Sequence, residues 1–93
     1  FYRSDPPADD EWITRPPDVA VEIRSLGQSR RDIRVKVDLH LRFGVPSVWV
    51  VDLESNEVEV YEDGARRVLS GPDVLESVNA PGMQFAVADL FER

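Results

Sequence analysis

The chain has 93 residues, a formal net charge of -7 at pH 7 and no cysteine. This length predicts a single domain over residues 1–93 with a modest core. The lack of cysteine excludes a disulfide framework and a thiolate metal site. No apolar run approaches the roughly 18 residues of a membrane-spanning helix, so we expect a cytoplasmic protein with no membrane partner. Because the chain starts at Phe1 rather than Met, we expect an N-terminally truncated fragment.

The negative charge argues at first against a nucleic-acid partner, because phosphate binding depends largely on Lys and Arg. The distribution of the charges weakens that argument. Residues 24–42 carry six Lys or Arg residues against two Asp residues, so this window is +4 and the rest of the chain is -11. The pattern indicates a basic stripe on an otherwise acidic domain. It would equally suit an ordinary solvated helix face.

The first predicted elements are an arm and a strand. Residues 4–17 are rich in Pro and Asp, which is typical of a loop or arm. Val19, Val21 and Ile23 then alternate with other residues, and this period of two predicts a strand over 18–24 that buries these three side chains.

A helix is predicted over 29–43. Ser29 followed by Asp32 resembles a capping box, and Gly44 with Pro46 predicts the end of the helix. The strict alternation of apolar residues between these signals would by itself predict a strand. A helix is preferred because parallel strands on either side need a crossover of about a dozen residues. Such a helix would be apolar on two sides and would need two neighbours or a partner chain.

The C-terminal half predicts further strands. Residues 47–52 are an apolar run typical of a central strand. Residues 58–69 predict a hairpin that turns at Asp63-Gly64 and has one solvent-exposed face. Residues 81–91 predict a turn, a short strand and a helical turn with four core side chains, Phe85, Val87, Leu90 and Phe91. The outline is an α/β or α+β sheet with helices packed on it.

Charged residues on the strand over 18–24 raise the question of chemistry. Asp18 and Glu22 would lie about 13 Å apart, too far to bind one ion together, so Asp18 is more simply explained by capping or by pairing with Arg15. Glu22 lies in the middle of the strand and needs a cation or a metal. Lys36 is the candidate cation. A carboxylate, a lysine and a basic stripe suit metal-assisted attack on a phosphodiester, and a structural Glu22–Lys36 ion pair would use the same residues.

Four segments between residues 17 and 91 resemble the Uma-two restriction endonuclease family, a branch of the PD-(D/E)XK nuclease superfamily. They are PDVAVEIRS, RRDIRVKVDLHLRFGVPSVWVVD, VEVYEDG and PGMQFAVADLF. The resemblance implies an α/β fold, a PD-(D/E)XK-like mixed β-sheet flanked by helices, with a helix over 29–43. It also implies that Glu22 binds a divalent metal, Mg²⁺ or Mn²⁺, and that Lys36 is the catalytic lysine. Arg24 occupies the strand position where the superfamily often keeps that lysine.

One part of the family pattern is missing. The first acidic ligand of the superfamily comes from the preceding strand, in a Pro-Asp motif, and residues 1–3 resemble the end of that strand. Pro17-Asp18 is too close to Glu22 to replace it. We therefore predict a divalent-metal-dependent DNA endonuclease that is incomplete in this chain.

The predicted catalytic residues are Glu22 and Lys36, and Glu22 is the metal ligand. Supporting roles are predicted for Asp18 and Arg24, and phosphate contacts for Arg30, Arg31, Arg34 and His40. The expected partners are DNA and a second copy in a homodimer. The alternative is a non-catalytic binding or dimerisation module that keeps the nuclease fold.

Overall fold

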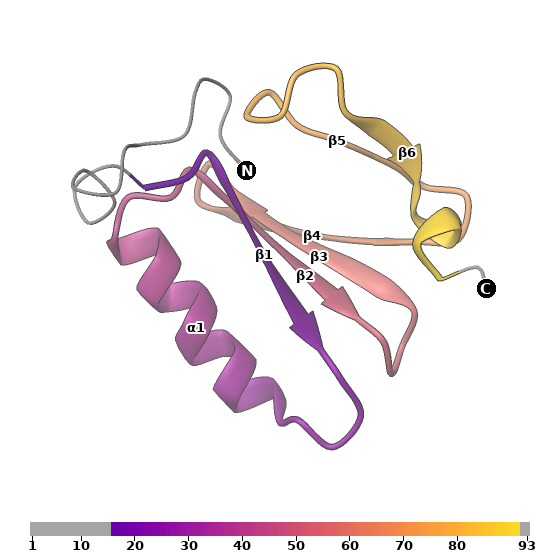
Figure 1. The fold of residues 1–93 in the computed structure, drawn as a ribbon, viewed down its shortest axis with the longest axis horizontal. Coiled ribbons are helices and arrows are strands. Elements are labelled where there is room, and N and C mark those ends of the chain that lie inside the picture. Colours follow the sequence, from indigo (N-terminus) through magenta and orange to yellow (C-terminus); the bar gives the residue numbers. More distant parts are fainter. Residues whose placement is uncertain (1–15, 92–93) are drawn as a thin grey trace.

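The computed structural model describes residues 16–91, and its main feature is a four-stranded mixed sheet. The strands lie in the order β1-β2-β3-β4; β1 and β2 are parallel, and the other neighbours are antiparallel (Figure 1). Their bounds are β1 Val19–Arg24, β2 Ser47–Asp52, β3 Glu57–Glu62 and β4 Ala65–Ser70. The mixed α/β fold expected from the sequence is thereby confirmed.

Helix α1, Arg30–Arg42, is the crossover between the two parallel strands. It begins at Ser29, whose hydroxyl accepts a hydrogen bond from the Asp32 backbone N–H at 3.0 Å. It ends before Gly44, whose φ of +94° few other residues tolerate. The caps and the need for a crossover therefore outweigh the strand-like alternation, and the predicted helix is confirmed.

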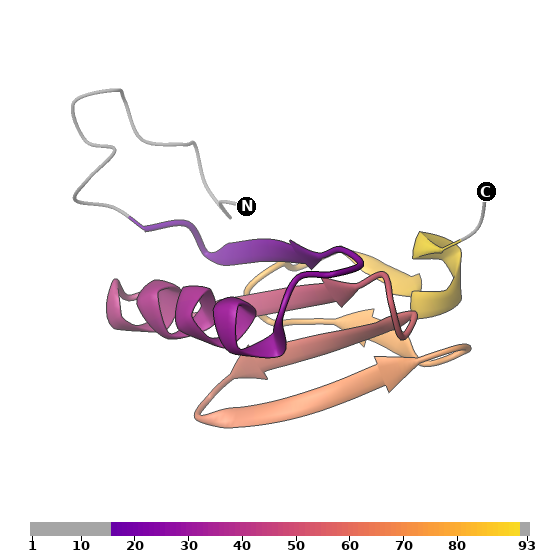
Figure 2. The ribbon, with the colours of Figure 1, turned by 90° about the horizontal axis from the view of Figure 1, so that it is seen from below.

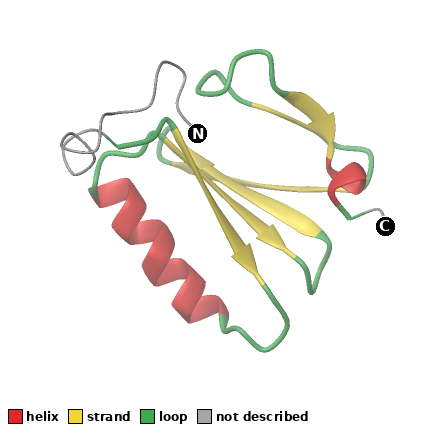
Figure 3. Cartoon of the chain, in the orientation of Figure 1, coloured by secondary structure: helices red, strands yellow, loops and turns green. Residues whose placement is uncertain are grey.

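The sheet lies between two layers. Helix α1 covers one face, and the hairpin of β5 (Val74–Glu76) and β6 (Gln84–Ala86) with the 3-10 helix η2 (Val87–Leu90) covers the other (Figures 1, 2 and 3). The core on the helix side consists of Ala20, Ile33, Val37, Val45, Val48 and Val50. The core on the hairpin side consists of Val19, Trp49, Val58, Val60, Leu75, Ala80 and Val87.

Of the three β1 side chains predicted to be buried, only Val19 is buried. Val21 and Ile23 are 50% and 58% exposed, whereas Ala20 and Arg24 are buried. The reason is that α1 packs on the side of the even-numbered residues, and the hairpin-side core reaches β1 only at Val19. Glu22 therefore lies on the face of β1 that α1 covers.

The predicted β3–β4 hairpin is confirmed, with positive φ at Asp63 (55°) and Gly64 (73°) as its two-residue turn requires. The face of the hairpin that was expected to be solvent-exposed is instead half-buried, since Tyr61 packs against the core on the helix side. The C-terminal prediction is largely confirmed. Its exception is Leu90, which lies exposed at the end of η2, one turn beyond the buried Val87.

Helix α1 is apolar on two sides, as predicted. Ile33 and Val37 are buried against the sheet, while Val35, Leu39 and Phe43 form a half-exposed line that we call the outer stripe. These three residues follow a spacing of four, so they share one side of the helix. No helix within residues 16–91 is long and apolar enough to cross a membrane.

Candidate active site

Strand β1 and helix α1 bring Glu22 and His40 together. Glu22 stands in the middle of β1, and His40 is in the last turn of α1. The His40 Nε2 and Glu22 Oε1 atoms are 3.0 Å apart. Since an ionised carboxylate can only accept a hydrogen bond, the imidazole donates from Nε2. The partner that the structure gives to Glu22 is therefore His40.

Neither side chain of this pair is sealed in the interior. The Glu22 side chain is 22% exposed and the His40 side chain 35%. Within the described residues the carboxylate makes its hydrogen bond through Oε1, and Oε2 makes none. The residues from 16 to 91 therefore leave one oxygen of this carboxylate without a hydrogen-bond donor.

Lys36 lies one helical turn before His40. Residues four apart share a side of a helix, so Lys36 and His40 project from the same side of α1. Lys36 is exposed and makes no hydrogen bond or ion pair with residues 16–91. Its ammonium group is thus not held by the described part of the chain, and its convergence with Glu22 on a shared ligand stays a prediction.

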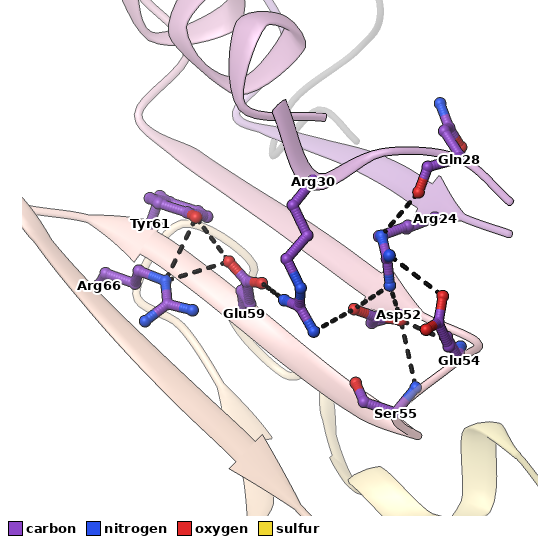
Figure 4. Close-up of polar contacts among 9 residues, drawn as sticks. All are labelled: Arg24, Gln28, Arg30, Asp52, Glu54, Ser55, Glu59, Tyr61 and Arg66. Carbon is purple, nitrogen blue, oxygen red and sulfur yellow. Dashed lines mark hydrogen bonds and ion pairs between the residues drawn. The ribbon is translucent and has the colours of Figure 1, made fainter. Parts of the chain in front are cut away.

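Arg24 is buried in a dense set of polar contacts two residues after Glu22 (Figure 4). Its Nη1 atom lies 3.0 and 3.1 Å from the two carboxylate oxygens of Asp52. Its Nε donates to the Gln28 carbonyl at 3.0 Å, and its Nη2 lies 3.1 Å from Glu54. A phosphate could contact this guanidinium only by replacing some of these partners. We call Arg24, Asp52 and Glu54 the Arg24 cluster.

Asp52 and Glu54 were given no role from the sequence, and Asp52 is the more buried of the two. Its carboxylate also accepts backbone N–H groups from Glu54 at 3.0 Å and Ser55 at 3.2 Å. Burial acts to raise the pKa of Asp52, but these two donors and Arg24 outweigh it and hold the pKa below its ordinary value. The available signal was a charged residue at the end of the apolar run 47–52.

A second acidic group continues the polar contacts across the sheet. Glu59 accepts hydrogen bonds from the Tyr61 hydroxyl at 2.5 Å and from Arg66 Nε at 3.1 Å (Figure 4). Burial would raise the pKa of Glu59, but Arg66, Tyr61 and Arg30 together lower it. The pKa of Tyr61 is raised by burial and by the Glu59 carboxylate.

Arg30 bridges the two carboxylate groups more loosely. It lies 3.8 Å from Asp52 and 3.6 Å from Glu59, and its side chain is half-exposed. Two further arginines with predicted phosphate contacts, Arg31 and Arg34, are exposed on α1. The basic residues of α1 therefore remain accessible even where they also neutralise carboxylates of the sheet.

The remaining sequence predictions concern the start of the chain. Asp18 is half-buried at the entry to β1, and its expected partner Arg15 lies outside the described residues. The predicted arm over 4–17 and the family-like residues 1–3 also lie mostly or wholly outside them. These predictions stay as stated.

The described residues can supply only part of a metal site. Between residues 16 and 91 there is no group of three or more His, Asp or Glu side chains placed to hold an ion. Mg²⁺, however, usually keeps several waters and takes one or two protein carboxylates together with substrate phosphates. The available Oε2 of Glu22 fits one ligand of such an ion.

Comparison with known proteins finds a matching family and a similar solved structure. Residues 1–88 match the model of the Uma-two family, whose description is "Putative restriction endonuclease". The fold is similar to the crystal structure of a putative nuclease from Anabaena variabilis, with 29% sequence identity and a TM-score of 0.71. That match covers 82% of this chain and 44% of the other, so the chain spans less than half of that protein's length. No curated protein matches the chain.

Proposed function

This chain belongs to the Uma-two restriction endonuclease family, and from that membership we propose that it forms part of a divalent-metal-dependent DNA endonuclease of the cytoplasm. The observation that carries the proposal is the half-buried carboxylate of Glu22, which lies beside helix α1. Within residues 16–91 one of its oxygens makes no hydrogen bond, and Lys36 on the same helix makes no ion pair. A carboxylate and a nearby cation are the groups that metal-assisted phosphodiester cleavage needs.

The acidic and the basic residues have different roles in this proposal. Glu22 holds Mg²⁺ or Mn²⁺, which when bound supplies an activated water and offsets charge on the scissile phosphate. Lys36 stabilises the charge that develops on the phosphate oxygens in the transition state. Arg31 and Arg34, which are exposed on α1, contact phosphates farther along the DNA.

Arg24 has a different role in this proposal. Because its guanidinium is buried and paired with Asp52, Arg24 fixes the end of β1 rather than contacting DNA. Asp18 supports the start of the same strand. The residues that act on the substrate are then Glu22, Lys36 and the exposed arginines.

The test is cleavage of plasmid DNA by the natural polypeptide in Mg²⁺. Glu22→Gln and Lys36→Ala should each lower the rate by about 100-fold or more, the usual effect of losing one preorganised charged group. Asp89→Asn, which changes an exposed carboxylate of η2 on the other side of the sheet, is the control and should cleave at the native rate. Native cleavage by either Glu22→Gln or Lys36→Ala, with the circular dichroism spectrum retained, contradicts the proposal.

The outer stripe of α1 supports a second proposal, assembly with another copy of the chain. Contiguous exposed apolar residues often mark an interface. Asp38 and Arg42 lie beside the stripe, so two copies could bury it with both signs of charge at the rim. The homodimer expected from the sequence would use this surface, whether or not the chain cleaves DNA.

A further inference from the structure

We infer that His40 is a positioning residue for Glu22: its hydrogen bond holds the carboxylate so that Oε2 faces the metal. The inference rests on the proposed function, because it assumes that Glu22 binds the ion. It assigns His40 to the carboxylate, in contrast to the phosphate contact expected from the sequence.

The geometry separates the two oxygens of Glu22. Oε1 accepts from His40 Nε2 at 3.0 Å, whereas Oε2 makes no hydrogen bond within residues 16–91. A glutamate side chain has three rotatable bonds, so a carboxylate without this contact would sample several orientations. The imidazole selects one of them. Neighbours that orient ligands in this way commonly change metal affinity by 10- to 100-fold.

The position of His40 is itself well fixed. Its backbone carbonyl accepts a hydrogen bond from the Val45 N–H at 3.0 Å, and Val45 is buried in the core on the helix side. Val37, three residues earlier, is also buried in that core. The imidazole therefore projects from a part of α1 that is anchored on both sides.

The same geometry disfavours a phosphate contact through His40 Nε2. That nitrogen already donates to Glu22, and a phosphate placed at it would meet the negative charge of the carboxylate. Lys36, one turn earlier and without a partner in the described residues, is better placed for an anion. On this side of α1, His40 therefore orients the Glu22 carboxylate and Lys36 contacts the anion.

The experiment measures Mn²⁺ affinity of the natural polypeptide by titration calorimetry without DNA. His40→Ala should weaken binding by 10- to 100-fold. His40→Gln should restore most of the affinity, since the amide of Gln can donate a similar hydrogen bond. Asp89→Ala, exposed on η2 in the layer on the other side of the sheet, is the control and should bind as the native chain does. If His40→Ala loses the native circular dichroism spectrum, His40→Phe replaces it, because it fills the space without a donor.

The outcomes distinguish this inference from the proposed function. Unchanged Mn²⁺ affinity in Glu22→Gln overturns the proposed metal ligand, and the inference with it. Loss of binding in Glu22→Gln together with native affinity in His40→Ala overturns the inference alone. Equal weakening by His40→Ala and His40→Gln, with the fold intact, also overturns it, because the donated hydrogen bond would then not be the cause.

Discussion

Two polar groups lie on the same face of β1, two residues apart, and they differ in how completely they are paired. Arg24 and Asp52 have side chains that are 9% and 1% exposed, and each makes several hydrogen bonds. Glu22 and His40 are more exposed and share one hydrogen bond. The deeper group is therefore fully paired, whereas the shallower group leaves one carboxylate oxygen of Glu22 without a hydrogen bond in residues 16–91.

The physical reason lies in the cost of burying charge. A charge removed from water must be fully paired, or it destabilises the fold by several kcal/mol. The Arg24 cluster meets this condition because backbone donors, a carbonyl and a second carboxylate complete the ion pair. Glu22 remains in partial contact with solvent, so an oxygen without a hydrogen bond in residues 16–91 is tolerated there.

The largest expected effect is that of breaking the Arg24 cluster. Asp52→Ala leaves the buried Arg24 guanidinium without its main partner and should lower the free energy of unfolding by about 3–5 kcal/mol. Urea denaturation followed by circular dichroism measures it. The control is Arg66→Ala at the exposed rim of the polar contacts, which should cost less than about 1 kcal/mol. Equal losses of unfolding free energy in Asp52→Ala and Arg66→Ala would contradict the prediction that the buried ion pair stabilises the fold more than the exposed one.

A smaller effect is expected from acid. The pKa values of Asp52, Glu59 and Glu62 in the folded chain are lowered, because hydrogen-bond donors and cations outweigh the effect of burial. Their stabilisation is therefore complete above their ordinary pKa values, 3.8 for Asp and 4.5 for Glu. It is lost as the pH falls through the lowered values.

The free energy of unfolding should accordingly fall as the pH drops below about 5. Denaturant titrations at a series of pH values measure this decrease. Asp52→Asn should show a shallower decrease than the native chain, because it removes one of the three titrating groups. A native chain whose stability did not change down to pH 3 would contradict the assignment.

The smallest expected effect on stability concerns the outer stripe of α1, which contains neither the Arg24–Asp52 pair nor the Glu22–His40 pair. Leu39→Glu should change the free energy of unfolding of the monomer little, because Leu39 is exposed. It should, however, convert a dimer to a monomer in light scattering. The control Val21→Glu, on the exposed hairpin-side face of β1, should leave the dimer intact. A native chain that is monomeric at all concentrations would refute assembly through this stripe.

The sequence predicted the elements whose signals are local. Ser29 and Gly44 specify the ends of α1, and Asp63-Gly64 specifies the tight turn of the hairpin. Strand β5 was not predicted, since three residues are too few to show a period. The burial of Val21 and Ile23 on β1 was predicted wrongly and that of Val19 correctly, because a period of two defines two faces without saying how far each is covered.

The site was predictable only in part for a similar reason. The mid-strand position of Glu22 indicated a need for a partner, but Lys36 and His40 lie on the same side of α1, one turn apart. Only the relative position of helix and strand decides which of them meets the carboxylate. Asp52 was missed because its partner Arg24 is 28 residues away in the sequence, opposite it in the parallel register.

The guanidinium of Arg24 joins three segments at one point: the end of β1, the end of β2 and the loop before α1, through the Gln28 carbonyl. The length of the loop between Arg24 and Ser29 is thus set by the reach of a side chain. An inserted residue there would either break the Gln28 contact or slide the helix along the sheet. Homologous chains that retain both Arg24 and Asp52 should therefore show no insertions or deletions in this loop.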